Sequence, residues 1–181
     1  MRVRRGRPPK LTLDPAESDL LRTLVKQVDE LLEADSADLA DRAGDDELAG
    51  IVGPMDSGDE ADDPVVRRLL PDAYRDDEAA AADWRRLGRG EVRAVKSEAM
   101  QRVLADVADD GPATIRLDDE HLGRWLPVLT DVRLALGERI GVTEDWVEEA
   151  ARLDEDDPLR DAYAIYDWLS MLQETILQAV M

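Results

Sequence analysis

The chain has 181 residues, no cysteine and a formal net charge of −20. This length allows one domain with a real hydrophobic core, whereas the lack of cysteine excludes disulfides, thiolate metal sites, cysteine nucleophiles and thiol redox sensing. No apolar segment follows the basic N-terminus as in a signal peptide, and none reaches the roughly 20 residues of a membrane span, so we expect a soluble, cytoplasmic protein.

The first 13 residues form a basic arm. They carry five Lys or Arg side chains and no acid, which leaves 18 basic and 43 acidic residues, a charge of −25, in the remainder. Within this arm, Arg5-Gly6-Arg7-Pro8 resembles the core of an AT-hook, which places Arg side chains in the minor groove of A·T-rich DNA. The alternative is a strand and turn with exposed arginines. The acidic body would in either case make binding to nucleic acid weak or indirect.

A helix over 14–33 is predicted to follow the arm. Asp14 can cap it, Pro15 suits the first helical position, and Glu17 completes a capping box. Leucine and valine then recur at helical spacing, which is typical of an amphipathic helix with one buried face.

Residues 34–63 break this pattern. They hold eleven acids, one Arg and several glycines, so we expect a flexible acidic linker, with a short helix over 46–52 as an alternative. Beyond it the apolar pattern returns and predicts helices over 64–70, 76–87 and 91–108. The expected buried stripe of the last of these is Val92, Val95, Ala99, Val103 and Val107.

Residues 113–117 alternate between apolar and polar, which predicts a short strand that pairs with the N-terminal stretch. A long helix over 119–140 follows, and Pro127 inside it predicts a kink or break. A short helix opens at Thr143, and the last helix runs from Pro158 to the C-terminus. The two long helices are expected to pack together and to bury Trp125, Leu129, Leu136, Leu169 and Leu172.

These elements predict a mainly α protein, a single-domain helical bundle with a small two-stranded β element formed by the N-terminal stretch and residues 113–117. The expected organisation is a basic strand region and first helix over 1–33, an acidic flexible linker over 34–63, and a helical core over 64–181 that forms one domain with 1–33.

Four polar side chains stand out within the apolar pattern of the two long helices: Asp131, Arg133, Arg139 and Gln173. An unpaired charge in a protein interior is costly, so we expect these residues to form a polar cluster at the junction of the helices. The cluster is either a structural pairing or a recognition site for a partner or ligand. Arg139, nearer the helix end, is the better candidate for such a contact.

No pattern of catalytic chemistry is present. The chain has no nucleophile elbow, no calcium-loop spacing and no phosphate-binding glycine loop. Its single histidine, His121, has no cysteine or second histidine with which to share a metal. The sequence therefore indicates no catalytic residue, no metal site and no cofactor.

Two blocks of the sequence carry a family resemblance. Residues 125–142 follow a pattern close to W-L-x-x-L-N-D-L-R-L-x-L-G-x-R-L, and residues 166–174 follow Y-x-W-L-x-x-L-Q-E. The matching residues are Trp125, Leu126, Leu129, Thr130, Asp131, Val132, Arg133, Leu134, Leu136, Gly137, Arg139 and Ile140, then Tyr166, Trp168, Leu169, Leu172, Gln173 and Glu174. The blocks resemble an actinobacterial domain-of-unknown-function family described as the actinomycete oxidative-stress transcriptional regulators. Thr130 departs from the usual Asn of the family, and Pro127 is unexpected.

The resemblance implies a stress-related regulator, although a chain without cysteine cannot sense oxidants through a thiol pair. We therefore expect a non-enzymatic cytoplasmic regulatory or interaction protein that acts on transcription through a protein partner, with the transcription machinery as one such partner. Two alternatives stay open. One is a minor-groove DNA-binding protein that uses Arg5 and Arg7, and the other is an unrecognised enzyme.

Overall fold

The computed structural model describes residues 1–4, 8–42, 63–74, 76–107 and 111–180. In chain order its elements are β1 (Arg2–Arg4), β2 (Lys10–Leu13), α1 (Pro15–Arg42), α3 (Pro64–Leu69), α4 (Glu78–Leu87), α5 (Arg89–Asp106), β3 (Ala113–Arg116), α6 (Asp119–Ile140), α7 (Trp146–Arg152) and α8 (Pro158–Val180). The prediction of a mainly α fold is confirmed. Across the ranges described, none of these helices has the length and apolar character that a membrane crossing requires.

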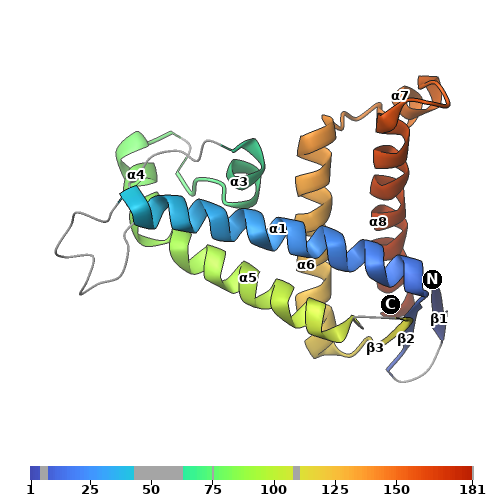
Figure 1. Ribbon diagram of the computed structural model, residues 1–181. Coiled ribbons are helices and arrows are strands. Elements are labelled where there is room, and N and C mark those ends of the chain that lie inside the picture. The colour runs from blue at the N-terminus through green and yellow to red at the C-terminus, as the bar shows by residue number, and fades with distance from the viewer. Residues whose placement is uncertain (5–7, 43–62, 75, 108–110, 181) are drawn as a thin grey trace.

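The long helices form two crossed pairs. Figure 1 shows α1 and α5 running side by side, and α6 and α8 forming a second pair that crosses them. The core fills the space between the pairs, where apolar side chains of α1, α5, α6 and α8 meet those of α3 and the sheet. Each helix is apolar along only part of its circumference, and burial of that part in the shared core stabilises the fold.

The sheet has three strands where two were predicted. It is antiparallel with the order β1-β2-β3, and Leu11 of β2 lies opposite both Val3 of β1 and Ile115 of β3. The basic arm thus contributes two strands that pair with each other. The third strand is favoured because an isolated two-stranded pairing would leave one edge of β2 without hydrogen-bond partners.

Helix α1 begins as predicted and ends later. The Asp14 amide donates to Glu17 Oε2 at 2.9 Å and the Glu17 amide donates to Asp14 Oδ1 at 2.9 Å, which completes the capping box. The helix continues past residue 33 to Arg42, because the three alanines and one leucine that follow favour helix even where apolar periodicity stops. Residues 43–62 of the predicted linker, with the alternative helix over 46–52, lie outside the described residues.

The predicted stripe of α5 is only half right. Val103 and Val107 are buried, whereas Val92 and Val95 are 36% and 62% exposed. In the N-terminal half of α5 the buried positions are instead Arg89 and Arg93.

Ionic contacts explain why charged side chains are buried in this half of α5. Arg89 and Arg93 each donate to Asp35 of α1, at 3.5 and 2.5 Å. Six residues earlier in α1, Asp29 is buried and accepts hydrogen bonds from Ser97 and Gln101 of α5. The α1–α5 interface is therefore partly a polar seam, in which the buried Asp29 and the partly buried Asp35 have partners that offset the cost of their desolvation.

The α6–α8 pair is the apolar centre of the fold. Trp125 and Leu129 of α6 and Leu169 and Leu172 of α8 are fully buried, as predicted, whereas Leu136 is only half-buried. Helix α6 runs through Pro127 as one element, so the predicted break is wrong. The Pro127 ring is exposed, which keeps it clear of the packed face.

Aromatic side chains join α7 to the outer end of this pair. The Trp146 ring stacks on Tyr163 at 6.0 Å between centroids and meets Tyr166 edge-on at 5.4 Å. Gly137 lies opposite Tyr166, where a Cβ atom would come within 3.2 Å of the ring. The lack of a side chain at this position lets α6 and α8 stay close where they project beyond α1 (Figure 1).

Candidate functional site

The four polar residues predicted as a cluster make separate contacts. Asp131 faces α5, where Lys96 Nζ donates to both carboxylate oxygens at 2.7 and 2.8 Å. Burial raises the pKa of Asp131 above its ordinary range, although Lys96 opposes the shift. Arg133 is half-buried and has no ion-pair partner among the described residues.

Gln173 joins the two long helices. Its Nε2 donates to Thr130 Oγ1 at 2.8 Å, and that hydroxyl donates to the Leu126 carbonyl at 2.8 Å. The Gln173 Oε1 atom is buried and has no hydrogen-bond partner within the described ranges. This contact lies inside the α6–α8 interface and therefore serves packing.

Arg139 is the exposed member of the four, with 54% of its side chain accessible. Its Nη2 donates to Asp63 Oδ2 at 2.6 Å, while Asp63 Oδ1 accepts from the Val65 amide at 2.8 Å and so caps α3. Partial burial raises the pKa of Asp63, but the Val65 amide and the Arg139 guanidinium outweigh it, so the pKa is lowered. Asp63 thereby ties the first turn of α3 to the last turns of α6.

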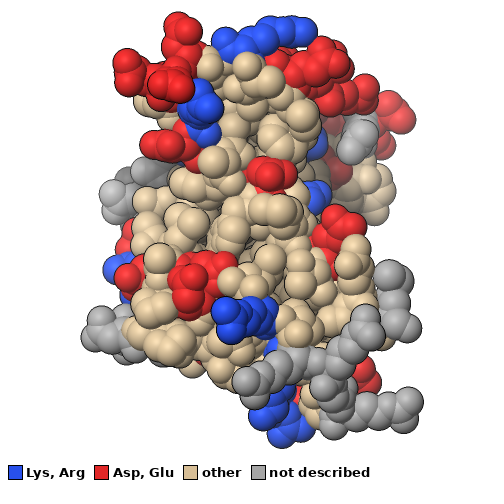
Figure 2. Space-filling view, turned by 90° about the vertical axis from the view of Figure 1, so that its right-hand side faces the viewer, with Lys and Arg blue, Asp and Glu red and all other residues tan. Residues whose placement is uncertain are grey.

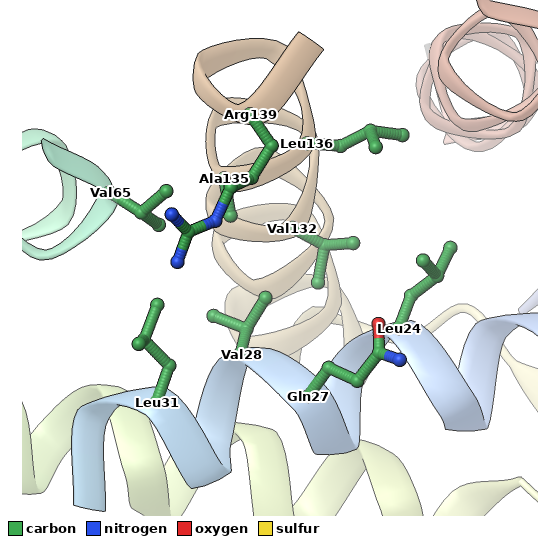
Figure 3. Close-up of a pocket in the computed structure, with 9 residues that line it drawn as sticks. All are labelled: Leu24, Gln27, Val28, Leu31, Val65, Val132, Ala135, Leu136 and Arg139. Atoms are coloured by element: carbon green, nitrogen blue, oxygen red, sulfur yellow. The ribbon is translucent and has the colours of Figure 1, made fainter. Parts of the chain in front are cut away.

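An apolar groove opens beside this ion pair, where α1, α3 and α6 meet. Its volume is about 210 Å³. Figure 3 shows Arg139 reaching from α6 toward Val65 of α3, along one side of the groove. The remaining walls come from Leu24, Gln27, Val28, Leu31, Val132, Ala135 and Leu136. The site thus combines apolar walls with one exposed cation and one exposed amide, which suits an apolar group with a polar edge.

Sequence reasoning found Arg139 but not the rest of this site. Asp63 was included in the acidic linker, although an Asp directly before Pro64 is a helix-cap signal that could have identified it. The walls contributed by α1 had no local signal, because their role depends on how α1 crosses α6.

The other sequence candidates are placed as follows. The His121 amide donates to Asp118 Oδ1 at 3.1 Å, which caps α6. The His121 Nδ1 atom lies 2.5 Å from the same carboxylate oxygen. Across the described ranges, no group of three or more His, Asp and Glu side chains is arranged to hold a metal ion. Arg5 and Arg7 lie outside the described residues, between β1 and β2.

Comparison with known proteins shows the family to which the chain belongs. Oxidative stress regulator AosR of Mycobacterium tuberculosis (strain ATCC 25618 / H37Rv) is 32% identical over 184 residues, which cover 94% of this chain and 81% of the relative. Putative oxidative stress regulator AosR of Mycobacterium leprae (strain TN) is 31% identical over 150 residues, 75% of this chain and 67% of the relative. No solved structure matches the chain. The model of the family described as "Domain of unknown function (DUF2017)" matches residues 1–180, and the chain belongs to this family.

Proposed function

We propose that the protein is a non-enzymatic, stress-related regulatory protein of the cytoplasm that acts by binding a protein partner. The observation that carries this proposal is the match of nearly the whole chain to relatives named oxidative stress regulators. Since these 181 residues include no cysteine, an oxidant-sensitive thiol would have to be supplied by the partner.

The groove beside Arg139 is the proposed contact. Its volume of about 210 Å³ lies below the roughly 300–1,000 Å³ that is usual for small-molecule sites. It therefore suits an inserted apolar side chain of a protein better than a free ligand. Arg139 and Gln27 at its edge supply the polar rim that surrounds such an anchor in protein interfaces.

Capture from the native cytoplasm tests the proposal. The full chain, an Arg139→Ala variant and a Gln27→Trp variant are used as baits, with cross-linking and mass spectrometry of the captured proteins. Gln27 is exposed, so the Trp side chain would cover the groove with little effect on stability. Arg152→Ala is the matched control, because Arg152 is also exposed and paired with a carboxylate, on α7.

The expected result is one partner that is captured by the wild type and by Arg152→Ala but lost from both groove variants. Equal capture by all four folded baits would remove the groove from the proposal. Failure of the wild type to capture any protein, under stress and without it, would overturn the function itself.

DNA binding by the basic arm is the second candidate. The observation in its favour is that Arg2 and Lys10, on the strands next to Arg5 and Arg7, are both exposed. Exposed cations on these strands are available to phosphate oxygens, which Lys and Arg contact in protein–DNA complexes.

A further inference from the structure

The outer face of α8 carries a regular stripe of small, apolar and uncharged side chains. Its residues alternate at spacings of four and three, as in the seam of a coiled coil: Ala164, Trp168, Met171, Thr175 and Gln178. At 100° per residue they lie opposite or beside the face that packs on α6, which is formed by Leu169, Leu172 and Ile176. Met171 is 47% exposed, and Trp168 is half-buried with its inner edge against the core.

This face is a surface of the molecule with few charges. Figure 2 looks onto the α8 side and shows a broad uncharged area, with mostly acidic side chains gathered at the end where α7 lies. From residue 162 to 180 the only charged side chains are Asp167 and Glu174, both exposed beside the stripe. The stripe is thus an uncharged seam, apolar at Ala164, Trp168 and Met171, with an acidic border on one side.

The charges beside the stripe determine which kind of partner can bind to it. In an antiparallel pairing of two copies centred on Met171, Asp167 of one copy would lie near Glu174 of the other. Two molecules that each carry a net charge of −20 also repel one another. A second copy is therefore disfavoured, whereas a helix with Lys or Arg beside its apolar seam would match the one acidic border that Asp167 and Glu174 form.

We propose that the outer face of α8 binds an amphipathic helix of a partner protein, with apolar residues along the stripe and basic residues against Asp167 and Glu174. The proposal rests on the proposed function, since it supposes a protein partner, and it adds a second contact surface far from the groove. Trp168 is the expected anchor, because large half-buried aromatic side chains dominate the affinity of such interfaces. The acidic residues of α7 would attract the basic helix toward the stripe.

The absence of cysteine makes a site-specific test possible. A single cysteine introduced as Gln178→Cys, at one end of the stripe, carries an environment-sensitive fluorophore. The matched control is Val95→Cys, an exposed position on α5. The labelled full chain is titrated with three synthetic helical peptides. The first has Leu at the seam and Lys at its borders, the second keeps Leu and replaces Lys by Glu, and the third keeps Lys and replaces Leu by Ser.

The Leu–Lys peptide should saturate the signal of the label at position 178 and leave the label at position 95 unchanged. Both other peptides should bind at least about tenfold more weakly. Met171→Arg should weaken binding of the Leu–Lys peptide by a similar factor. Reversal of the acidic border, Asp167→Lys with Glu174→Lys, should transfer the preference to the Leu–Glu peptide. Circular dichroism verifies that each variant is folded.

Three results would overturn the proposal: equal responses of the two labels, no effect of Met171→Arg, or a dimer in sedimentation that Met171→Arg dissolves. The border-reversed variant also serves as a bait in the cytoplasmic capture. If it still captures the partner, the α8 surface is rejected and the proposed function stands. If the peptides behave as expected but the wild type captures nothing, the surface stands and the proposed function is rejected.

Discussion

Lys96 and Asp131 show how a buried charge is held between two helices. Asp131 is 6% exposed, and its carboxylate depends on the Lys96 ammonium for neutralisation. We predict that Lys96→Met costs about 3 kcal/mol at neutral pH, because it leaves this carboxylate buried without a cation. The measurement is the free energy of unfolding in urea.

The pH dependence gives a second readout of the same pair. A carboxyl whose pKa is raised by folding binds its proton more tightly in the folded state, so stability falls as pH rises through that pKa. The loss in Lys96→Met should therefore shrink as the pH is lowered, because the raised pKa of Asp131 lets its carboxyl accept a proton above the ordinary range of aspartate. The double variant Lys96→Met with Asp131→Leu should recover most of the stability. A double variant as unstable as the single one would contradict the ion pair as the cause.

Asp63 has two separable roles, as cap of α3 and as partner of Arg139. Asp63→Ala should cost about 1–1.5 kcal/mol, because it removes both the cap and an exposed ion pair. Asp63→Asn keeps the cap and should cost only about 0.5 kcal/mol. Thermal unfolding of the two variants measures the difference, and equal losses would show that capping is not the larger contribution.

The lowered pKa of Asp63 determines how its contribution to stability changes with pH. A carboxyl whose pKa is lower in the folded state than in the unfolded state stabilises the fold when it is ionised. This contribution is complete above the unfolded-state pKa of about 4, and it is lost as the pH falls through the folded-state pKa. The gap between wild type and Asp63→Asn should therefore close on acidification, as the protonated Asp63 no longer attracts Arg139. A gap that is constant with pH would exclude a contribution from the charge.

At the scale of elements, the α6–α8 pair should supply much of the stability. Leu169→Ala should cost about 2–5 kcal/mol, because Leu169 is fully buried between the helices. Leu136→Ala should cost clearly less, since Leu136 is half-buried and faces the open groove. Urea denaturation midpoints of the two variants compare them, and a larger loss for Leu136 would mean that the groove is closed in solution.

The helices themselves were largely predictable from apolar periodicity and caps. Asp14 caps α1 as expected, Asp118 caps α6, and Gly141 ends α6 with a left-handed φ of 67°. The buried face of α5 was not predictable, because the pattern assumes that charged side chains point outward. Burial of Arg89 and Arg93 depends on partners distant in sequence, such as Asp35, which lies more than 50 residues away and accepts from both.

Only one residue of the candidate site, Arg139, was predictable from the sequence. Arg139 could be singled out as a cation near a helix end, but the groove combines residues 24–31, 65 and 132–139. Its shape follows from the crossing of α1 over α6 and from the Asp63 tie. Neither is encoded in a local pattern, so single-sequence reasoning could not assemble the site.

At the scale of the whole molecule, charge limits contact with DNA. The arm can neutralise at most five phosphates, while the remaining 168 residues carry a charge of −25. The logarithm of the binding constant should therefore fall with the logarithm of salt concentration at a slope no steeper than about −4.5. Fluorescence anisotropy with an A·T-rich duplex measures this, with Arg5→Ala and Arg7→Ala together as the control. Submicromolar, sequence-selective binding at physiological salt would reverse the order of the two candidate functions.

The three-stranded sheet also has a consequence for the protein during its synthesis. Leu13 of β2 pairs with Ala113 of β3, one hundred residues later. At roughly 5–20 residues per second, the ribosome delivers β3 about 5–20 s after β2. For that time the β1–β2 pair has an open edge, which invites pairing with other nascent chains. The exposed cations Arg2 and Lys10 on these strands repel such pairing between identical chains. The basic arm thus protects the growing polypeptide before any folded surface exists.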